Sequence, residues 1–136
     1  MEKILDVLLI EDNLIEVMKM ERAISSLGLN HIINVANNGE EALEILEDNQ
    51  QWPDLILLDL NMPRISGIEF LMILKNNDDL KHIPTVILTT SDNQKDIEEC
   101  YRIGVSGYIV KPLKYYDYVD KIQNVLSYWG INEIKQ

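Results

Sequence analysis

The sequence is poor in cysteine, in basic residues and in long hydrophobic runs, and each shortage excludes a class of protein. One cysteine, Cys100, excludes an internal disulfide and is typical of a buried free thiol in a reducing compartment. The chain has 12 Lys and Arg against 23 Asp and Glu, a formal charge of -11. Because binding to nucleic acid or to an anionic membrane needs clustered cations, we expect neither partner.

Long apolar segments and glycine-rich phosphate loops are also missing. Asp6 and Glu11 interrupt the N-terminal stretch MEKILDVLLIEDN, so it does not form the core of a signal peptide. No apolar run approaches the roughly 20 residues of a transmembrane helix, and no GxxxxGK[ST] motif indicates nucleotide hydrolysis. We therefore expect a cytoplasmic protein with a single domain over residues 1–136 and no output domain.

The apolar residues that are present form five short runs of strand length. They are rich in Val, Ile and Leu without clean polar alternation, which is typical of strands covered on both faces by helices. Apolar residues at helical spacing follow each run, and the first such segment includes Leu14, Val17 and Met18. The pattern predicts an α/β fold: a (βα)5 doubly wound, parallel five-stranded sheet of flavodoxin-like order 2-1-3-4-5. The predicted strands are residues 5–10, 32–36, 55–58, 85–88 and 107–110.

Turn and cap residues mark the predicted helix boundaries. Asn13, Asn37 or Asn38, Ser66, and Asp92 or Asn93 are the expected N-caps, and Gly28 follows the first helix where a C-cap glycine belongs.

Polar residues with complementary chemistry follow four of the five predicted strands. Glu11 and Asp12 follow the first strand, Asp59 and Asn61 the third, Thr89 the fourth, and Lys111 and Pro112 the fifth. In open α/β sheets the ligand site lies at the carboxyl ends of the strands, so these groups should converge. Each residue taken singly is also compatible with a turn, a helix cap or a solvated charge. The joint arrangement favours a site.

Three converging carboxylates repel one another unless a cation neutralises them. A set of oxygen donors with room for water suits Mg²⁺, with Mn²⁺ as the alternative, and suits Zn²⁺ poorly. Lys111 supplies a positive charge and Thr89 a hydroxyl, so a tetrahedral anion fits between them and the metal ion. The residues predict a phosphoryl site with a carboxylate at its centre.

Four segments, LLIEDN, PDLILLDLNMPRISG, PTVILTTSD and GYIVKPL, resemble the response-regulator receiver domain of two-component signalling over nearly the whole chain. The resemblance implies that Asp59 is the phosphoacceptor. It implies that Glu11, Asp12, Asp59 and the backbone carbonyl of Asn61 hold the metal ion. In detail, LLDLNMP, TTSD and the terminal YW are most similar to the stand-alone receivers associated with phytochrome kinases.

The resemblance also implies a switch. Thr89 and Lys111 would contact the phosphoryl group, Lys111 would precede a cis Pro112, and Thr89 and Tyr108 would be the switch residues, with Tyr108 moving from an exposed to a buried position. The signal would leave through the face formed by the fourth helix, the fifth strand and the fifth helix. Aromatic residues enrich that region, and we expect a homodimer or partner contact there, with five candidate interface residues: Tyr101, Tyr108, Tyr115, Tyr116 and Trp129.

The expected partner is a sensor histidine kinase, with the phytochrome type as one candidate, or a phosphotransfer protein. The protein would be a phosphoacceptor with self-phosphorylation and self-dephosphorylation activity and not an enzyme. The main alternative is a small Mg²⁺-dependent phosphatase of the haloacid-dehalogenase type, although Asn61 stands where that class has a second Asp. A flavodoxin-like FMN carrier is disfavoured because Glu11 and Asp12 would repel its phosphate. A receiver-like interaction module that is never phosphorylated is the third alternative.

Overall fold

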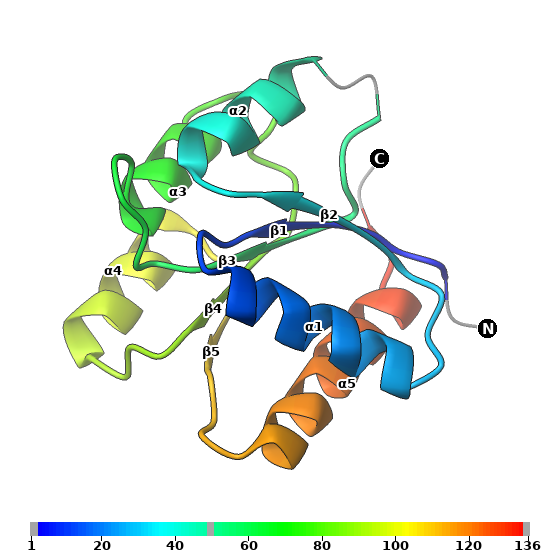
Figure 1. The fold of residues 1–136 in the computed structure, drawn as a ribbon. Helices are drawn as coiled ribbons and strands as arrows, with labels where there is room; N and C mark the ends of the chain where they lie inside the picture. The colour runs from blue at the N-terminus through cyan, green and yellow to red at the C-terminus, as the bar shows by residue number, and fades with distance from the viewer. Residues whose placement is uncertain (1–2, 49–50, 135–136) are drawn as a thin grey trace.

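The computed structural model describes residues 3–48 and 51–134, in which strands and helices alternate along the chain (Figure 1). The strands are β1 (Asp6–Ile10), β2 (Ile32–Ala36), β3 (Leu55–Leu58), β4 (Thr85–Thr89) and β5 (Gly107–Val110). The helices are α1 (Leu14–Ser26), α2 (Gly39–Asp48), α3 (Gly67–Lys75), α4 (Gln94–Ile103) and α5 (Tyr115–Ile131).

All strands are parallel and lie in the order β2-β1-β3-β4-β5, which confirms the predicted topology. Helices α1 and α5 cover one face of the sheet, and α2, α3 and α4 cover the other (Figure 1). The winding reverses between β1 and β3, so the crevice expected to hold a ligand opens beside the central strand.

Two hydrophobic clusters explain why the strands show no polar alternation. Leu8 and Ile56 pack toward α2, α3 and α4, whereas their neighbours Val7 and Leu57 pack toward α1 and α5. Successive side chains of a strand point to opposite faces, and both faces here are covered, so every position of β3 is buried. The buried central strands fix the positions of the residues that follow them.

The helix boundaries follow local hydrogen-bond chemistry. The side chains of Asn13, Ser66 and Asn93 accept hydrogen bonds from backbone N–H groups in the first turns of α1, α3 and α4. Asn38, rather than Asn37, accepts the N–H of Glu41 at 2.8 Å. Gly28, just beyond α1, has a φ of 67°, in the left-handed region that glycine adopts without strain.

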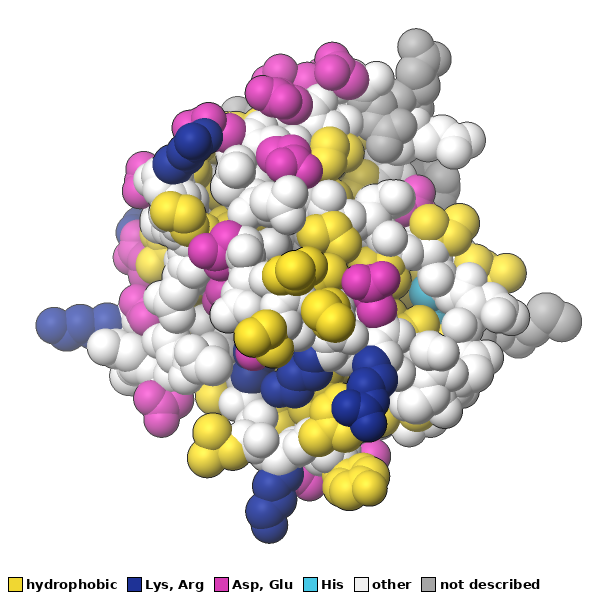
Figure 2. Space-filling view, in the orientation of Figure 1, with side chains coloured by type: hydrophobic (Ala, Val, Ile, Leu, Met, Phe, Trp, Pro, Cys, Tyr) yellow, Lys and Arg dark blue, Asp and Glu magenta, His cyan; other side chains and the backbone are white. Residues whose placement is uncertain are grey.

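The apolar spacing of α1 does not fix which of its side chains are buried, since Leu14 and Met18 both lie outside the core. Their exposed fractions are 70% and 59%, and the buried side of the helix consists of Val17, Met20, Ala23 and Ile24. This helix packs through a narrow stripe against the sheet and α5, so apolar side chains near its N-terminus remain outside. Figure 2 shows hydrophobic side chains gathered on this side of the molecule, with Lys and Arg side chains beside them.

None of the helices within residues 3–48 and 51–134 combines the length and the apolar character needed to cross a membrane.

Candidate functional site

Backbone hydrogen bonds extend the sheet by one residue beyond three of its strands, and these extra residues form the site. Glu11 donates its N–H to the carbonyl of the last residue of β2 at 3.0 Å. Asp59 donates to the end of β1 at 3.1 Å, and Lys111 donates to the end of β4 at 2.7 Å. The main chain therefore holds all three residues rigidly at the carboxyl edge of the sheet.

The three predicted carboxylates meet at this edge. Each of Glu11, Asp12 and Asp59 offers one oxygen, and these oxygens all lie within 4.8 Å of one another. Glu11 and Asp59 are 3% and 8% exposed, whereas Asp12 is exposed. An all-oxygen donor set with one solvent-facing member fits a hard divalent ion that keeps part of its water shell.

Burial and charge both act on Glu11. Burial and the neighbouring carboxylate of Asp59 raise the pKa of Glu11 to about 7, although the Lys111 ammonium opposes this rise. A buried carboxylate that ionises only near neutrality, beside a second one, is a strong site for a cation.

Lys111 reaches into the same cluster. Its side chain is 6% exposed, and Nζ donates a hydrogen bond to Glu11 Oε1 at 2.8 Å. Burial lowers the pKa of Lys111, but the hydrogen bond to Glu11 and the charges of Glu11, Asp59 and Glu16 raise it above its ordinary value. The side chain is therefore a fixed cation beside Asp59.

Thr89 and Tyr108 are linked through one loop. Thr89, the last residue of β4, is fully buried, and its hydroxyl accepts the N–H of Ser91 at 3.4 Å. The Ser91 carbonyl accepts the phenol hydroxyl of Tyr108 at 2.9 Å. The Tyr108 ring is partly buried against the α2, α3 and α4 cluster, so this structure holds it in an inward position.

The loop after β3 is held tightly against the start of α3. The N–H of Asn61 donates to Asp59 Oδ1 at 3.4 Å, while the Asn61 residue itself is exposed. A Cβ atom on Gly67 would lie 2.5 Å from the Asp59 carbonyl oxygen, closer than real contacts allow. Glycine is thus required here so that the helix can approach the site.

The predicted cis bond before Pro112 is wrong, because every peptide bond within the described residues is trans. The trans form is favoured by about 0.5–1 kcal/mol for bonds before proline. With this trans bond, Lys111 still donates its backbone N–H to β4 and its ammonium to Glu11. The ion pair therefore does not depend on a cis isomer.

The predicted aromatic interface divides into two groups. Tyr101 and Tyr116 point to solvent, with exposed fractions of 52% and 83%. Tyr108, Tyr115 and Trp129 are partly buried, and the last two pack against the α1 and α5 cluster. Of the five candidates, only Tyr101 and Tyr116 are mostly exposed to solvent.

Glu16 and Gly67 were not among the predicted site residues. Glu16 Oε2 lies 3.4 Å from Lys111 Nζ. The available signal was its position, since Glu16 is an acid in the first turn of α1, the helix that directly follows Glu11 and Asp12. For Gly67, a glycine in the first turn of a helix signals a close approach of backbone.

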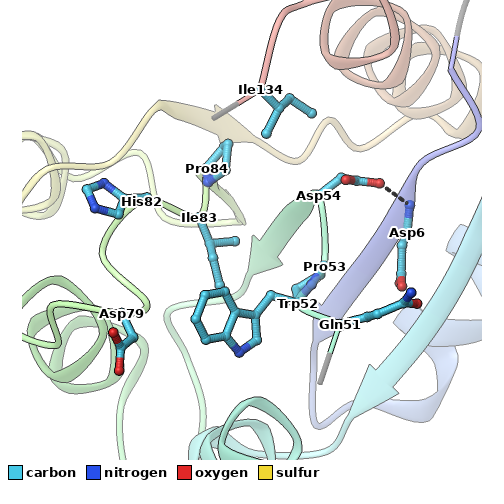
Figure 3. A pocket seen from close by; sticks show the side chains of 10 residues that line it. All are labelled: Asp6, Gln51, Trp52, Pro53, Asp54, Asp79, His82, Ile83, Pro84 and Ile134. Carbon is cyan, nitrogen blue, oxygen red and sulfur yellow. Dashed lines mark hydrogen bonds between the residues drawn. The ribbon is translucent and has the colours of Figure 1, made fainter. Parts of the chain in front are cut away.

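The opposite edge of the sheet carries a different feature, a groove of about 440 Å³ (Figure 3). Trp52, Ile83 and Pro84 supply apolar surface, and Asp54 and Asp79 supply charge. Asp54 Oδ2 accepts the backbone N–H of Asp6 at 2.9 Å. None of the predicted site residues lines this groove.

Comparison with known proteins agrees with this geometry. The family model described as the response regulator receiver domain matches residues 7–123. The chain belongs to the response regulator receiver family. A curated relative of this receiver is the response regulator Rcp1 of Synechocystis sp., 34% identical over 128 residues that cover 90% of this chain and 87% of Rcp1.

Two solved structures are similar over almost the full length of the receiver. One is the phosphorylated cyanobacterial phytochrome response regulator RcpA, with a TM-score of 0.91, 30% identity and coverage of 98% of this chain and 100% of that one. The other is the Mn²⁺-bound form of Rcp1, with a TM-score of 0.88, 31% identity and coverage of 97% and 99%. The receiver therefore has the flavodoxin-like fold of its family and serves in signalling by phosphorylation.

Proposed function

We propose that this receiver accepts a phosphoryl group on Asp59 from a histidine of a sensor kinase or of a phosphotransfer protein. The observation that carries the proposal is the placement of a buried carboxylate, Asp59, between two acids that suit a metal ion and one fixed ammonium, Lys111. Phosphoryl transfer depends mainly on positioning and on charge stabilisation, and this site offers both.

The residues have separate roles in the transfer. An Asp59 oxygen forms the bond to phosphorus as the bond from phosphorus to the donor histidine nitrogen breaks, and that nitrogen takes up a proton. Lys111 neutralises charge on the phosphoryl oxygens. Glu11, Asp12, Asp59 and the Asn61 carbonyl would hold Mg²⁺ or Mn²⁺, which supplies charge neutralisation when bound. Attack by water on the acyl phosphate later removes the group, so the signal ends itself.

Thr89, Ser91 and Tyr108 would carry the signal away from Asp59. A phosphoryl group gives the buried Thr89 hydroxyl a new acceptor, and the Thr89 hydroxyl contacts the loop whose carbonyl holds Tyr108. A shift of that loop would change the α4, β5 and α5 face. The signal would then be read by a partner or by a second copy of the receiver.

The remaining assignments are supported by similarity. Because RcpA is named as a phytochrome response regulator, we infer that a phytochrome-type histidine kinase is the donor. We also infer a cytoplasmic protein that acts as a receiver and not as an enzyme on an external substrate. Tyr101 and Tyr116, the most exposed of the candidate interface residues, are the first residues to test in a homodimer.

Intact-mass analysis after incubation with acetyl phosphate and Mg²⁺ tests the proposal. Wild type should gain one phosphoryl group, and Asp59→Asn should gain none. If wild type gains no mass with either acetyl phosphate or a phosphorylated kinase, the proposal is wrong. An undiminished adduct on the variant would place the acceptor elsewhere.

A further inference from the structure

Glu16 lies beside the phosphoryl site without belonging to its carboxylate cluster. It stands in the first turn of α1, and its Oε2 atom lies 3.4 Å from Lys111 Nζ. Its side chain is 24% exposed, although the Oε2 atom itself is buried. The ammonium of Lys111 therefore lies within ion-pair distance of both Glu16 and Glu11.

The two glutamates hold Lys111 in different ways. Glu11 accepts a well-formed hydrogen bond from the ammonium at 2.8 Å. Glu16 Oε2 has no hydrogen-bond partner within residues 3–48 and 51–134, so the charge of Lys111 is what compensates its burial. The ion pair between Glu16 and Lys111 is attractive, but no hydrogen bond is lost when the ammonium turns away from Glu16. Lys111 can therefore exchange Glu16 for another anion at little cost.

Several anions share the single charge of Lys111, so a change in the partner of Lys111 affects how favourable phosphorylation is. One ammonium faces the carboxylates of Glu11, Glu16 and Asp59, all of which influence its ionisation. An acyl phosphate at Asp59 would carry about −1.5 to −2 charges in place of the single charge of the carboxylate, and it would need the same ammonium. Glu16 then loses the ammonium that compensates its burial while the negative charge at Asp59 grows, and both effects oppose phosphorylation.

We propose that Glu16 competes with the phosphoryl group for Lys111 and thereby sets how tightly the site holds that group. Glu16 is a positioning residue, since it acts through Lys111 and does not touch the phosphoryl group. The inference rests on the proposed function, because it assumes that Asp59 carries the phosphoryl group.

A merely structural role for Glu16 makes a different prediction. An acid in the first turn of a helix is stabilised by the helix dipole. Loss of that role would lower the stability of α1 but would leave the binding of an anion at Asp59 unchanged or weaker. Competition for Lys111 predicts the opposite direction, namely tighter binding of a phosphoryl mimic when the charge of Glu16 is removed.

The test compares the affinity for beryllofluoride at saturating Mg²⁺, followed by fluorine NMR, in wild type, Glu16→Gln, Glu16→Asp and Glu21→Gln. Glu21 is an exposed acid on the same helix, so its variant controls for a change of net charge. Glu16→Gln should bind about tenfold more tightly, as expected for removal of one like charge from a partly screened site. Glu16→Asp, which keeps the charge, and Glu21→Gln should remain within about twofold of wild type. Urea unfolding checks that each variant is folded.

The outcomes separate the two proposals. If wild type binds beryllofluoride and Glu16→Gln binds it equally or more weakly, the role of Glu16 is wrong while the proposed function stands. An increase in Glu16→Asp as large as that in Glu16→Gln would also overturn it, since side-chain size and not charge would then be decisive. If folded wild type with saturating Mg²⁺ does not bind beryllofluoride at all, the proposed function fails and this inference fails with it.

Discussion

The two ends of the sheet both carry acidic side chains, but they use them differently. At the amino end, Asp54 accepts a backbone N–H from Asp6, and Asp6 accepts the side-chain amide of Asn34 at 3.2 Å. At the carboxyl end, Glu11 and Asp59 are buried and face each other within a three-carboxylate cluster. Acids that accept local hydrogen bonds stabilise a strand entrance. Buried acids that face one another create a demand for a cation.

Ionisation reflects this difference. Burial raises the pKa of Asp6, the hydrogen bond from Asn34 opposes the rise, and Asp54 adds to it. At the other end the pKa of Glu11 reaches about 7 even with Lys111 beside it. Burial is the largest cause at both ends, and the ends differ because Glu11 is 3% exposed whereas Asp6 is only partly buried.

The largest expected effect is on phosphoryl uptake, which a substitution at the carboxyl end should abolish and a substitution at the amino end should not. Asp59→Asn should abolish phosphoryl uptake from acetyl phosphate, because the nucleophilic oxygen is lost. Asp54→Asn, at the amino end, should keep the rate of phosphoryl uptake within about twofold of wild type. Substitutions at distant sites that share no partners act independently of one another. Intact-mass time courses measure both variants. Equal loss in the two variants would show that the ends do not act separately.

Divalent metal affinity should show the next largest effect. Asp12→Asn should weaken Mg²⁺ binding about 10-fold to 100-fold, the range observed when groups that support a metal site are lost. Asp79→Asn, in the groove at the amino end, should leave the affinity unchanged. Isothermal titration with Mg²⁺ and with Mn²⁺ measures the change. Comparable weakening by Asp79→Asn would argue against a single metal site at the carboxyl end.

Stability should change in opposite directions at the two ends. In metal-free buffer at pH 8, Asp59→Asn should raise the free energy of unfolding by about 1 kcal/mol, because it removes repulsion from Glu11. Asp54→Asn should lower it by about 1 kcal/mol, because the hydrogen bond to Asp6 loses its charged acceptor. Urea unfolding with a chelator measures both.

The stabilising effect should depend on pH. The folded-state pKa of Glu11, about 7, lies above its ordinary value of 4.5, so its contribution favours the fold at low pH and is lost as the pH rises through 7. The gain from Asp59→Asn should therefore shrink between pH 8 and pH 5.5. A gain that does not change over this range would contradict the charge explanation.

The smallest effect concerns single neutral hydrogen bonds. Tyr108→Phe removes the bond to the Ser91 carbonyl, and Trp52→Phe removes the indole bond to the Leu46 carbonyl at 3.2 Å. Each should cost about 0.5 kcal/mol in unfolding free energy, the lower end of the range for a neutral hydrogen bond. Only Tyr108→Phe should alter the spectral change that beryllofluoride produces, because only this residue contacts the loop beside Thr89. Near-ultraviolet circular dichroism distinguishes the variants.

Much of the fold follows from local patterns in the sequence. Uninterrupted apolar runs predict strands buried on both faces, and alternation with helical segments predicts the parallel order that the structure has. The side of α1 that is buried could not be read in the same way. Leu14 and Met18 fit the apolar spacing but are exposed, because packing against α5 decides which stripe is covered.

The site was predictable to the extent that its central residues lie one residue beyond three of the strands. Glu11, Asp59 and Lys111 follow buried strands directly, so the position of the strand end fixes the position of the side chain. Glu16 was missed because its role depends on the direction of a side chain on a helix. The prediction of a cis peptide bond before Pro112 was wrong because it came from the family resemblance and not from a local physical requirement.

The contact between Glu11 and Lys111 joins residues that are 100 positions apart in the chain. Closing so long a loop has an entropic cost that must be met before the contact can stabilise the fold. A nascent or truncated chain that lacks β5 has the acids of the site without their cation. The proposed phosphoryl transfer would therefore require a chain that has folded through β5, because Lys111 directly follows that strand.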